Sequence, residues 1–312
     1  MAEFHHISVL HDECIEALRI RPNGVYADAT LGGGGHSMSI AEKLGSEGRL
    51  YGIDRDADAL AAAGARLAPY ADRVRLIKSD FRYLGEHIRE KLDGILFDLG
   101  VSSFQLDEAQ RGFSYMADAP LDMRMDRSAE LTAYDVVNGY AKEDLARIIS
   151  QYGEERYAYA VASAIVRRRE QAPVSTTLEL ARVVADAIPN AKKEKQHPAK
   201  RTFQAIRIEV NDELSAIAPA IDAAVGLLKP GGRILVISFH SLEDRIVKQR
   251  FRTLANGCTC PPEFPVCICG GKSVLKLCGK PVLAGPEELL ANPRARSAKL
   301  RIAEKSEAQE NV

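Results

Sequence analysis

The chain has 312 residues, of which 46% are hydrophobic and 27% are charged, which is typical of a globular protein with two domains or one domain and a large insertion. No apolar run approaches the roughly 20 residues that a membrane-spanning helix needs, which argues against an integral membrane protein. The formal net charge of −1 excludes a polycation, so any contact with nucleic acid must come from local basic patches.

The first residues of the chain do not resemble a signal peptide. His5 and His6 stand where the apolar core of such a peptide would lie. The six cysteines are clustered rather than spread, which argues against the disulfide framework of a secreted protein. We therefore expect a cytoplasmic protein.

Short apolar segments alternate with helical patterns through the first hundred residues. Strands are predicted at residues 25–29, 49–53, 74–77 and 94–97, and an alanine-rich helix is predicted at residues 57–67. Strands that alternate with helices form βαβ units, in which the strands run parallel. The first part of the chain is therefore expected to form a parallel sheet.

The pattern changes in the middle of the chain and then returns. From about residue 132 to residue 188 the apolar positions recur at helical spacing, and no strand of comparable quality interrupts them. A helix near residues 213–228, a turn at 229–232 and a strongly apolar strand at 233–239 follow. We predict a Rossmann-like α/β sheet with an all-helical insertion between its fourth and fifth strands.

The predicted domain boundaries follow from these changes of pattern. Residues 1–108 and 209–305 should form one discontinuous α/β domain, and residues 109–208 should form the helical insertion. The polar end of the chain, residues 306–312, has the composition of a disordered tail.

Polar features at the ends of the first three predicted strands indicate a cofactor site. Four glycines, residues 32–35, let the backbone approach a ligand closely, and Asp54 is placed to bind ribose hydroxyls. Asp80 and Phe81 are placed to meet the amine and the ring face of an adenine. The glycines match a dinucleotide-binding fingerprint only in part, because the third glycine position holds another residue type. Together these features are typical of S-adenosylmethionine methyltransferases.

The fourth predicted strand ends on a carboxylate, Asp98, and runs directly into G-V-S-S. In an open parallel sheet, the loops at the carboxyl ends of strands hold ligands, so this strand end is a candidate rim of an active site. The ordinary alternative is a solvated carboxylate followed by a polar turn.

Conspicuous sequence blocks extend from near the start of the chain to residue 301. The most specific are D-G-I-L-F-D-L-G-V-S-S-F-Q-L-D at residues 93–107 and S-F-H-S-L-E-D-R at residues 238–245. Others are D-A-T-L-G-G-G-G-H-S at 28–37, R-G-F-S-Y-M at 111–116, P-L-D-M-R-M at 120–125 and N-P-R-A-R-S-A-K-L-R at 292–301. These blocks resemble those of one family, the small-subunit 16S ribosomal RNA cytosine-N4 methyltransferases (RsmH, also called MraW).

This resemblance implies a cofactor, a substrate and a set of contacts. The cofactor is S-adenosylmethionine, and the acceptor is the exocyclic N4 of a specific cytidine in the decoding region of 16S rRNA, so the partner is the small ribosomal subunit. The family's cofactor contacts fall on Gly34, Gly35, His36, Asp54, Phe81, Asp98 and Gln105. In this assignment the glycine loop meets the methionine moiety, Asp54 the ribose and Phe81 the adenine, while Asp98 and Gln105 lie near the transferred methyl group.

The group that holds the target base is less evident. Many amino-methyltransferases place an Asp/Asn-Pro-Pro-aromatic motif at this strand end, whereas the present chain has D-L-G-V. We hypothesise that the Asp98 carboxylate or the Leu99 carbonyl accepts a hydrogen bond from N4. Ser102, Ser103 or His240 is then expected to hold the ring.

Both histidines of these motifs also have ordinary explanations. His240 follows the last apolar strand, where a histidine can simply bond to a neighbouring turn. His36 follows the glycine loop, where a histidine can lie on the surface at the start of a helix.

Basic segments at three places are candidates for contact with RNA. They are residues 167–169, residues 192–201, and a cluster formed by Arg294, Arg296, Lys299 and Arg301. Charge runs are usually solvated faces, but three of them in a chain of near-zero net charge favour a separate surface for phosphates. Chemistry on an RNA base requires an unstacked nucleotide, and we expect the helical insertion to position it.

Four of the cysteines form a C-x-C…C-x-C pattern. Cys258, Cys260, Cys267 and Cys269 could hold a tetrahedral zinc ion, although the spacing is tighter than in most zinc sites. Such a metal would be structural, because methyl transfer needs none. The alternative is a set of reduced thiols in a proline-rich loop.

Two other functions are compatible with parts of this pattern. A nucleotide-dependent oxidoreductase could use the glycine loop and Asp54, but the adenine-side residues and the missing third glycine argue against it. A non-catalytic ribosome-assembly factor could keep the fold, but it would have no need of Asp98 and Gln105. The sequence indicates neither an oligomeric state nor the assembly state of the ribosomal substrate.

Overall fold

The computed structural model describes residues 8–189, 196–257 and 271–307. The chain forms two compact units, one made of Met1–Gly100 and Leu214–Val312 and the other of Val101–Glu213. The chain therefore leaves the first unit directly after the fourth strand and returns at the helix that precedes the fifth. The second unit is longer at both ends than the insertion of residues 109–208 expected from the sequence.

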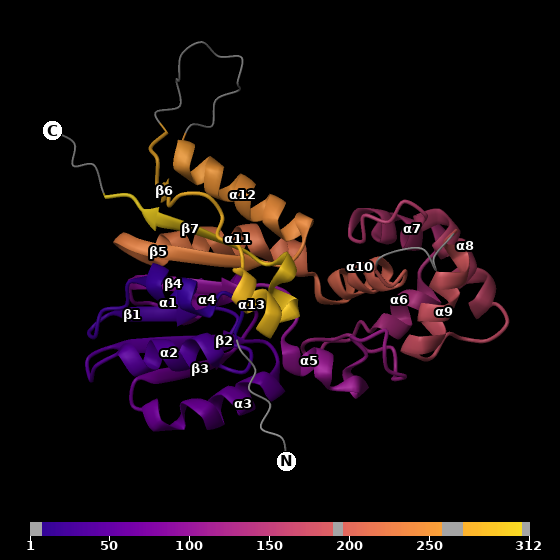
Figure 1. Ribbon diagram of the computed structural model, residues 1–312, viewed down its shortest axis with the longest axis horizontal. Coiled ribbons are helices and arrows are strands. Elements are labelled where there is room, and N and C mark those ends of the chain that lie inside the picture. Colours follow the sequence, from indigo (N-terminus) through magenta and orange to yellow (C-terminus); the bar gives the residue numbers. More distant parts are fainter. Residues whose placement is uncertain (1–7, 190–195, 258–270, 308–312) are drawn as a thin grey trace, which may run out of the picture. The chain divides into compact units, whose positions relative to one another are not determined.

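The first unit is built on a seven-stranded sheet in the order β3-β2-β1-β4-β5-β7-β6 (Figure 1). Strands β1 to β5 run parallel, and β7 is antiparallel to both β5 and β6. The strands are β1 Val25–Asp28, β2 Arg49–Asp54, β3 Val74–Lys78, β4 Leu92–Asp98, β5 Leu228–Ser238, β6 Leu275–Leu277 and β7 Lys299–Lys305.

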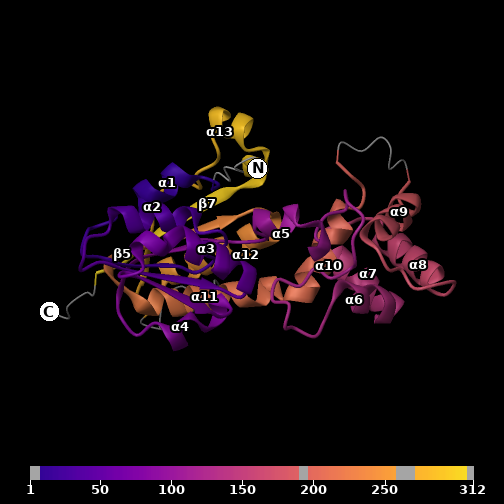
Figure 2. The same ribbon diagram turned by 90° about the horizontal axis from the view of Figure 1, so that it is seen from below.

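Helices cover both faces of this sheet, as the two views in Figures 1 and 2 show. One face carries α1 His11–Leu18, α2 Gly35–Lys43, α3 Ala57–Leu67 and α13 Pro286–Ala291. The other carries α4 Leu84–His87, α11 Glu213–Leu227 and α12 Ser241–Asn256. Short 3₁₀ turns complete the unit: η1 Ala68–Tyr70, η2 Phe81–Tyr83 and η5 Pro293–Ser297.

Strand β4 shows why the sequence forms this layered structure. Ile95 and Phe97 pack against the α11 face, while Leu96 packs against the α1 face, and all three are almost fully buried. A strand that is covered on both sides has a continuous apolar run rather than an alternating one. Burial of each such side chain contributes about 1.5–3 kcal/mol, so β4 anchors the sheet beside its topological switch point.

The predicted fold class is confirmed by this sheet and by the helical segment between β4 and β5. The predicted turn at residues 229–232 is wrong, because these residues form a bulge inside β5, where the partner of Leu92 is Leu228 and the partner of Gly94 is Arg233. The sequence analysis also missed β6 and β7. Strand β7 buries Leu300 and Ala303 but also carries three of the chain's cations, which hides its strand pattern.

The second unit is helical. Its elements are α5 Ser103–Asp107, η3 Ala109–Arg111, α6 Ala133–Gly139, α7 Lys142–Gln151, α8 Ala158–Arg169, α9 Thr177–Ala187 and α10 Lys200–Asn211. Helices α6 to α10 share one apolar core, in which Ile148, Val161 and Ile206 are completely buried. None of the helices in the described ranges is long and apolar enough to cross a membrane.

The irregular segment between η3 and α6 is held by buried polar side chains. The Asn211 side chain accepts from the Met125 amide at 2.7 Å and donates to the Met123 carbonyl at 2.7 Å. Arg111 donates to the carbonyl oxygens of Arg124 and Met125, each at 3.0 Å. Gly112 has φ +72°, and a Cβ there would lie 2.4 Å from a backbone oxygen, so this turn requires glycine. Residues of the R-G-F-S-Y-M and P-L-D-M-R-M blocks therefore stabilise this irregular segment.

Candidate active site

Carboxylates end three neighbouring strands of the first unit. Asp28, Asp54 and Asp98 are the last residues of β1, β2 and β4, and Glu243 lies in the first turn of α12, directly after β5. Because these strands are parallel, their carboxyl ends meet at one edge of the sheet. The sequence analysis identified Asp54 and Asp98 but not Asp28 or Glu243.

The glycine loop joins β1 to α2 and is fixed by Asp54. The Asp54 carboxylate accepts from the Gly32 amide at 2.8 Å and from the Asp56 amide at 2.9 Å. Gly34, with φ +74°, precedes the first residue of α2. A left-handed residue at this position turns the chain into the helix and favours glycine. Burial raises the pKa of Asp54.

Asp28 is buried beneath this loop. Its carboxylate accepts from the Ser37 hydroxyl at 2.7 Å and from the Thr30 amide at 3.3 Å. Burial raises its pKa to about 6, although the hydrogen bond from Ser37 opposes the shift. Asp28 is the first residue of the D-A-T-L-G block. Its position at the end of an apolar strand is the sequence feature that could have identified it as part of this edge.

Asp98 has the least satisfied carboxylate of this edge. Its Oδ1 is buried without a hydrogen-bond partner among the described residues, and its Oδ2 lies 3.7 Å from His36 Nε2. Its amide donates to the Thr30 hydroxyl at 2.5 Å, which fixes the strand end. Burial, followed by the charges of Asp28 and Glu243, raises the pKa of Asp98 to about 8. Buried, incompletely bonded carboxyl groups in this type of position are candidates for function.

His240 and Glu243 form a pair at the turn between β5 and α12. His240 Nε2 lies 3.1 Å from Glu243 Oε1. Glu243 Oε2 accepts from the amides of Phe239 and His240 at 2.8 and 3.3 Å, and the Glu243 side chain is 1% exposed. The ring of His240 therefore lies against a buried acid of its own turn.

His36 is buried in the first turn of α2 rather than exposed on the surface, so that alternative is wrong. Its ring stacks on the ring of His11, with centroids 5.7 Å apart and an interplanar angle of 14°. His11 in turn hydrogen-bonds Ser39 at 2.8 Å. Nothing in the sequence pattern indicated this pair, because α1 and α2 are brought together only by the fold.

The residues expected on the adenine side follow β3. Phe81 begins η2 and packs edge-on against Phe97, with ring centroids 5.9 Å apart. The Asp80 carboxylate accepts from the Arg82 amide at 2.9 Å and lies 3.3 Å from Arg55. Asp80 therefore already has protein partners, and the contact of Phe81 with adenine stays a prediction.

Gln105 and the two serines belong to the second unit. Ser102 caps α5, since its hydroxyl accepts from the Gln105 amide at 3.2 Å and its own amide donates to the Gln105 side chain at 3.0 Å. This reciprocal arrangement is a capping box, which stabilises a helix start. Gln105 is buried, and Ser103 begins the helix.

The basic segments are partly structural. Arg168 pairs with Glu179, and Arg169 donates to the carbonyl oxygens of Val137 and Tyr140. Lys299 and Arg301 both pair with Asp244 in α12. Part of the segment at residues 192–201 and the four cysteines Cys258, Cys260, Cys267 and Cys269 lie outside the described residues.

The sheet order, the glycine loop after β1 and the acids at the ends of β2 and β4 define a Rossmann-like S-adenosylmethionine-dependent methyltransferase. The sequence pattern of the MraW methylase family matches residues 3–306. The ribosomal RNA small subunit methyltransferase H of Brevibacillus brevis is 55% identical over 308 residues, 97% of this chain and 98% of that protein. The chain therefore belongs to the MraW methylase family.

Other comparisons agree with this assignment. The ribosomal RNA small subunit methyltransferase H of Clostridioides difficile is 53% identical over 309 residues, which cover 97% of this chain and 99% of that protein. Among solved structures, an rRNA methylase from Streptococcus thermophilus has a TM-score of 0.42 and 13% identity, with 95% of this chain and 94% of that chain covered. That distant likeness carries no part of the assignment. Membership of the family excludes the oxidoreductase alternative.

Proposed function

We propose that this S-adenosylmethionine-dependent rRNA methyltransferase modifies the exocyclic N4 of one cytidine in the decoding region of 16S rRNA. The relatives that match nearly the whole chain are ribosomal RNA small subunit methyltransferases H. The observation that carries the choice of acceptor is the buried Asp98 Oδ1 without a hydrogen-bond partner in the described structure. An exocyclic amine can supply the hydrogen that this oxygen lacks.

The residues at the strand edge fit the cofactor. The left-handed Gly34 turns the chain into α2, and the amides at the start of this helix suit the methionine moiety next to Gly35 and His36. Asp54 uses two of its roughly four acceptor positions on backbone amides, which leaves room for ribose hydroxyls. Phe81 presents an aromatic face for adenine. When bound, S-adenosylmethionine supplies a methyl group activated by a sulfonium.

Asp98 is assigned the task of activating the amine. The N4 lone pair is delocalised into the cytosine ring, so the nitrogen is a weak nucleophile. A carboxylate that accepts from an N4 hydrogen favours a pyramidal nitrogen and stabilises the positive charge that develops on it. Transfer of the methyl group would leave N4 positively charged and the rest of the cofactor as a neutral thioether. N4 then loses one proton, which Asp98 accepts and passes to water.

The neighbouring groups position the base. Glu243 holds the His240 ring, so His240 can contact the cytosine in a single orientation. The Leu99 amide donates to the Ile237 carbonyl at 3.0 Å, which fixes the peptide that offers the Leu99 carbonyl as a second acceptor. The family resemblance implies that Gln105 contributes near the methyl group, and our own hypothesis is that Ser102 or Ser103 contacts the ring.

The test is methyl transfer from labelled S-adenosylmethionine to purified small subunits that lack the modification, followed by nuclease digestion and nucleoside mass analysis. N4-methylcytidine at a single site is the expected result. Label on another atom contradicts the choice of acceptor. Cofactor binding without any transfer to rRNA contradicts the enzymatic function and supports the assembly-factor alternative.

Two further predictions rest on the sequence alone. An enzyme with this substrate is expected in the cytoplasm, where small subunits are made. The cysteines Cys258, Cys260, Cys267 and Cys269 are proposed as a structural zinc site. Measurement of zinc in the purified protein and in a Cys258→Ser variant tests the site, and equal zinc content in the two contradicts it.

A further inference from the structure

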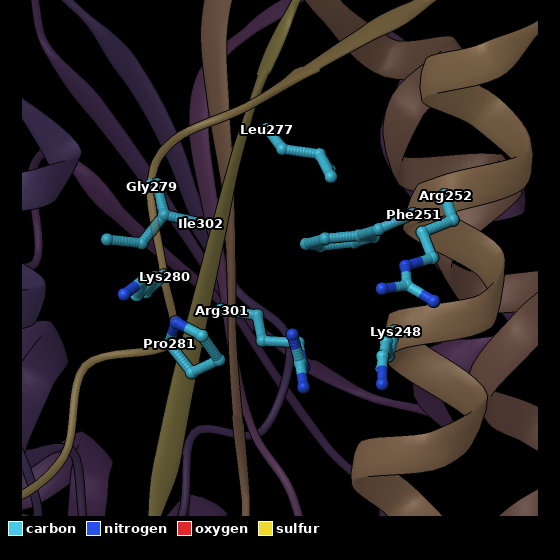
Figure 3. A pocket seen from close by; sticks show the side chains of 9 residues that line it. All are labelled: Lys248, Phe251, Arg252, Leu277, Gly279, Lys280, Pro281, Arg301 and Ile302. Carbon is cyan, nitrogen blue, oxygen red and sulfur yellow. The ribbon is translucent and has the colours of Figure 1, made fainter.

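A cavity of about 300 Å³ lies between α12 and the β6–β7 edge of the sheet (Figure 3). Lys248, Phe251 and Arg252 line it from α12, and Arg301 lines it from β7. None of these residues takes part in the carboxylate edge described above. The cavity is therefore separate from the carboxylate edge.

The cavity gathers positive charge. Lys248 and Arg252 are exposed, and neither forms an ion pair or a hydrogen bond with another residue in the described part of the chain. They are four residues apart on one helix, so their side chains are neighbours and repel each other. Arg301 uses its Nε to bond Asp244 at 2.7 Å, which holds its guanidinium in place beside them. Figure 3 shows the nitrogens of these three side chains facing the same space.

The acids near this cavity are already neutralised. Asp244 accepts from both Lys299 and Arg301, and these partners hold its pKa below the usual range despite its partial burial. Glu304 lies 3.0 Å from Arg233. No described carboxylate pairs with Lys248 or Arg252, so an anion from outside the molecule is the missing counter-charge.

Apolar groups complete the lining. Phe251, which is buried, and Pro281 both line the cavity. Leu277 is a large hydrophobic residue that is 42% exposed. Cations beside apolar surface suit a sugar–phosphate chain, because the phosphate meets the cations and the ribose or a base covers the apolar atoms.

We propose that this cavity binds the phosphate backbone of the substrate rRNA, at a contact separate from the site of methyl transfer. The inference rests on the proposed function, since it deepens the recognition of the same substrate. Helix α12 begins directly after His240 and rises about 1.5 Å per residue, so Lys248 and Arg252 lie roughly 12 and 18 Å along the helix from His240. The helix thus links the residues that hold the base to a backbone contact a few nucleotides away.

The test compares a Lys248→Glu/Arg252→Glu variant with a Lys43→Glu control. Lys43 is exposed at the end of α2 and forms no described ion pair, so it reverses a charge away from the cavity. Each full-length protein is titrated against a labelled single-stranded 20-nucleotide RNA at several salt concentrations. We expect about tenfold weaker binding for the double variant, with a salt slope smaller by about one per lost phosphate contact, and no change for the control.

Further measurements distinguish a lost phosphate contact from unfolding or from a lost cofactor site. A Lys248→Gln/Arg252→Gln variant should also bind the RNA more weakly than the wild type, but by a smaller factor. Thermal melts of all variants show whether each one is folded. In the methyl-transfer assay the double variant should raise the KM for small subunits while the Kd for S-adenosylmethionine stays the same. An uncharged morpholino oligomer of the same sequence should bind all variants equally.

Unchanged affinity and salt slope in a folded double variant overturn the cavity proposal and leave the proposed function intact. A higher KM for small subunits with unchanged affinity for RNA also overturns it, because it indicates a contact with ribosomal protein. If the wild-type protein binds RNA through the cavity but methylates no rRNA, the proposed function fails and the cavity proposal stands.

Discussion

The two units bury polar groups in opposite ways. In the helical unit, Asn211 and Arg111 are buried against backbone carbonyls and amides, and Asp122 is paired with Arg124. In the sheet unit, Asp28 and Asp98 are carboxylates near one another, and no described lysine or arginine is paired with either of them.

The two kinds of buried polar group serve different purposes: those of the helical unit stabilise the fold, and those of the sheet unit are candidates for catalysis. Burial alone would raise the pKa of Asp122, but its bonds with Arg124 outweigh burial and lower it, so this carboxylate is stably ionised. Burial and neighbouring charges raise the pKa of Asp98 to about 8, so the sheet unit keeps a carboxyl group whose ionisation depends on its surroundings. The first arrangement stabilises the fold, whereas the second costs stability and provides a reactive group.

The largest expected effect comes from removing the Asp98 charge. Asp98→Asn keeps the shape of the side chain but weakens the acceptor for N4, so kcat should fall by roughly a hundred- to a thousandfold at saturating S-adenosylmethionine. Single-turnover methylation of small subunits measures this. Asp72→Asn, which changes an exposed carboxylate, is the control. Full turnover by Asp98→Asn would falsify the role of the carboxylate and leave the Leu99 carbonyl as the acceptor.

The corresponding change in the helical unit should act on stability. Asn211→Ala removes bonds to the Met125 amide and to the Met123 and Arg207 carbonyls, which are left buried without partners. The free energy of unfolding should fall by about 2–3 kcal/mol. Urea unfolding followed by circular dichroism measures it, with the exposed Asn256→Ala as a control. Equal midpoints for the two variants would contradict the structural role.

The affinity for S-adenosylmethionine should depend on pH through the ionisation of Asp98, unlike any property that depends on the stably ionised Asp122. S-adenosylmethionine is cationic at sulfur, so it should bind better once Asp98 is ionised. Its affinity should rise by as much as about tenfold per pH unit and level off near pH 8, the pKa of Asp98 in the free protein. Asp28, Glu243, Cys14 and His36 are the other titratable groups here. Isothermal titration at several pH values measures the slope.

S-adenosylhomocysteine, which is neutral at sulfur, is the matched control ligand and should show a weaker dependence. Because the folded-state pKa of Asp98 is raised, the folded protein holds a proton that the unfolded chain has lost between about pH 4 and pH 8. The free energy of unfolding should therefore fall as pH rises through this window, and Asp98→Asn should remove the part of the fall between about pH 6 and pH 8, where Asp28 contributes little. Parallel slopes for both ligands would show that Asp98 does not meet the sulfonium.

The smallest expected effect comes from Glu243→Gln. This change keeps the size of the side chain and removes one of the charges that raise the pKa of Asp98. The plateau of cofactor affinity should move below pH 8, and kcat should fall only severalfold because His240 loses its charged partner. Glu287→Gln on the exposed end of α13 is the control. An unchanged plateau would show that Glu243 acts on His240 alone.

The sequence predicted features that depend on local patterns. Apolar runs located the five parallel strands, and the glycines together with Asp54 located the cofactor loop. Strand β7 was missed because Leu300 and Ala303 alternate with charged residues that resemble a basic cluster. Local pattern also did not indicate the protein partners of Arg168 and Arg169, which are distant in sequence.

The missed site residues share one property. Asp28 and Glu243 are ordinary acids in sequence, and only burial beside Asp98 makes them unusual. A motif shows that a carboxylate follows a strand, but it does not show how much water that carboxylate keeps. Glu243 stands three residues after His240 in S-F-H-S-L-E-D-R, and that helical spacing was the signal that could have identified it.

The positions at which the chain passes from one unit to the other also have an evolutionary consequence. The helical unit leaves the sheet after Gly100 and returns before Leu214, and the pairing of β4 with β5 is made entirely within the first unit. Insertions, deletions or replacement of loops among the helices therefore leave the register of the sheet unchanged. Selection can therefore vary the surface of helices α6 to α10 while the sheet and its carboxylate edge are inherited intact, because one continuous stretch of the gene encodes those helices.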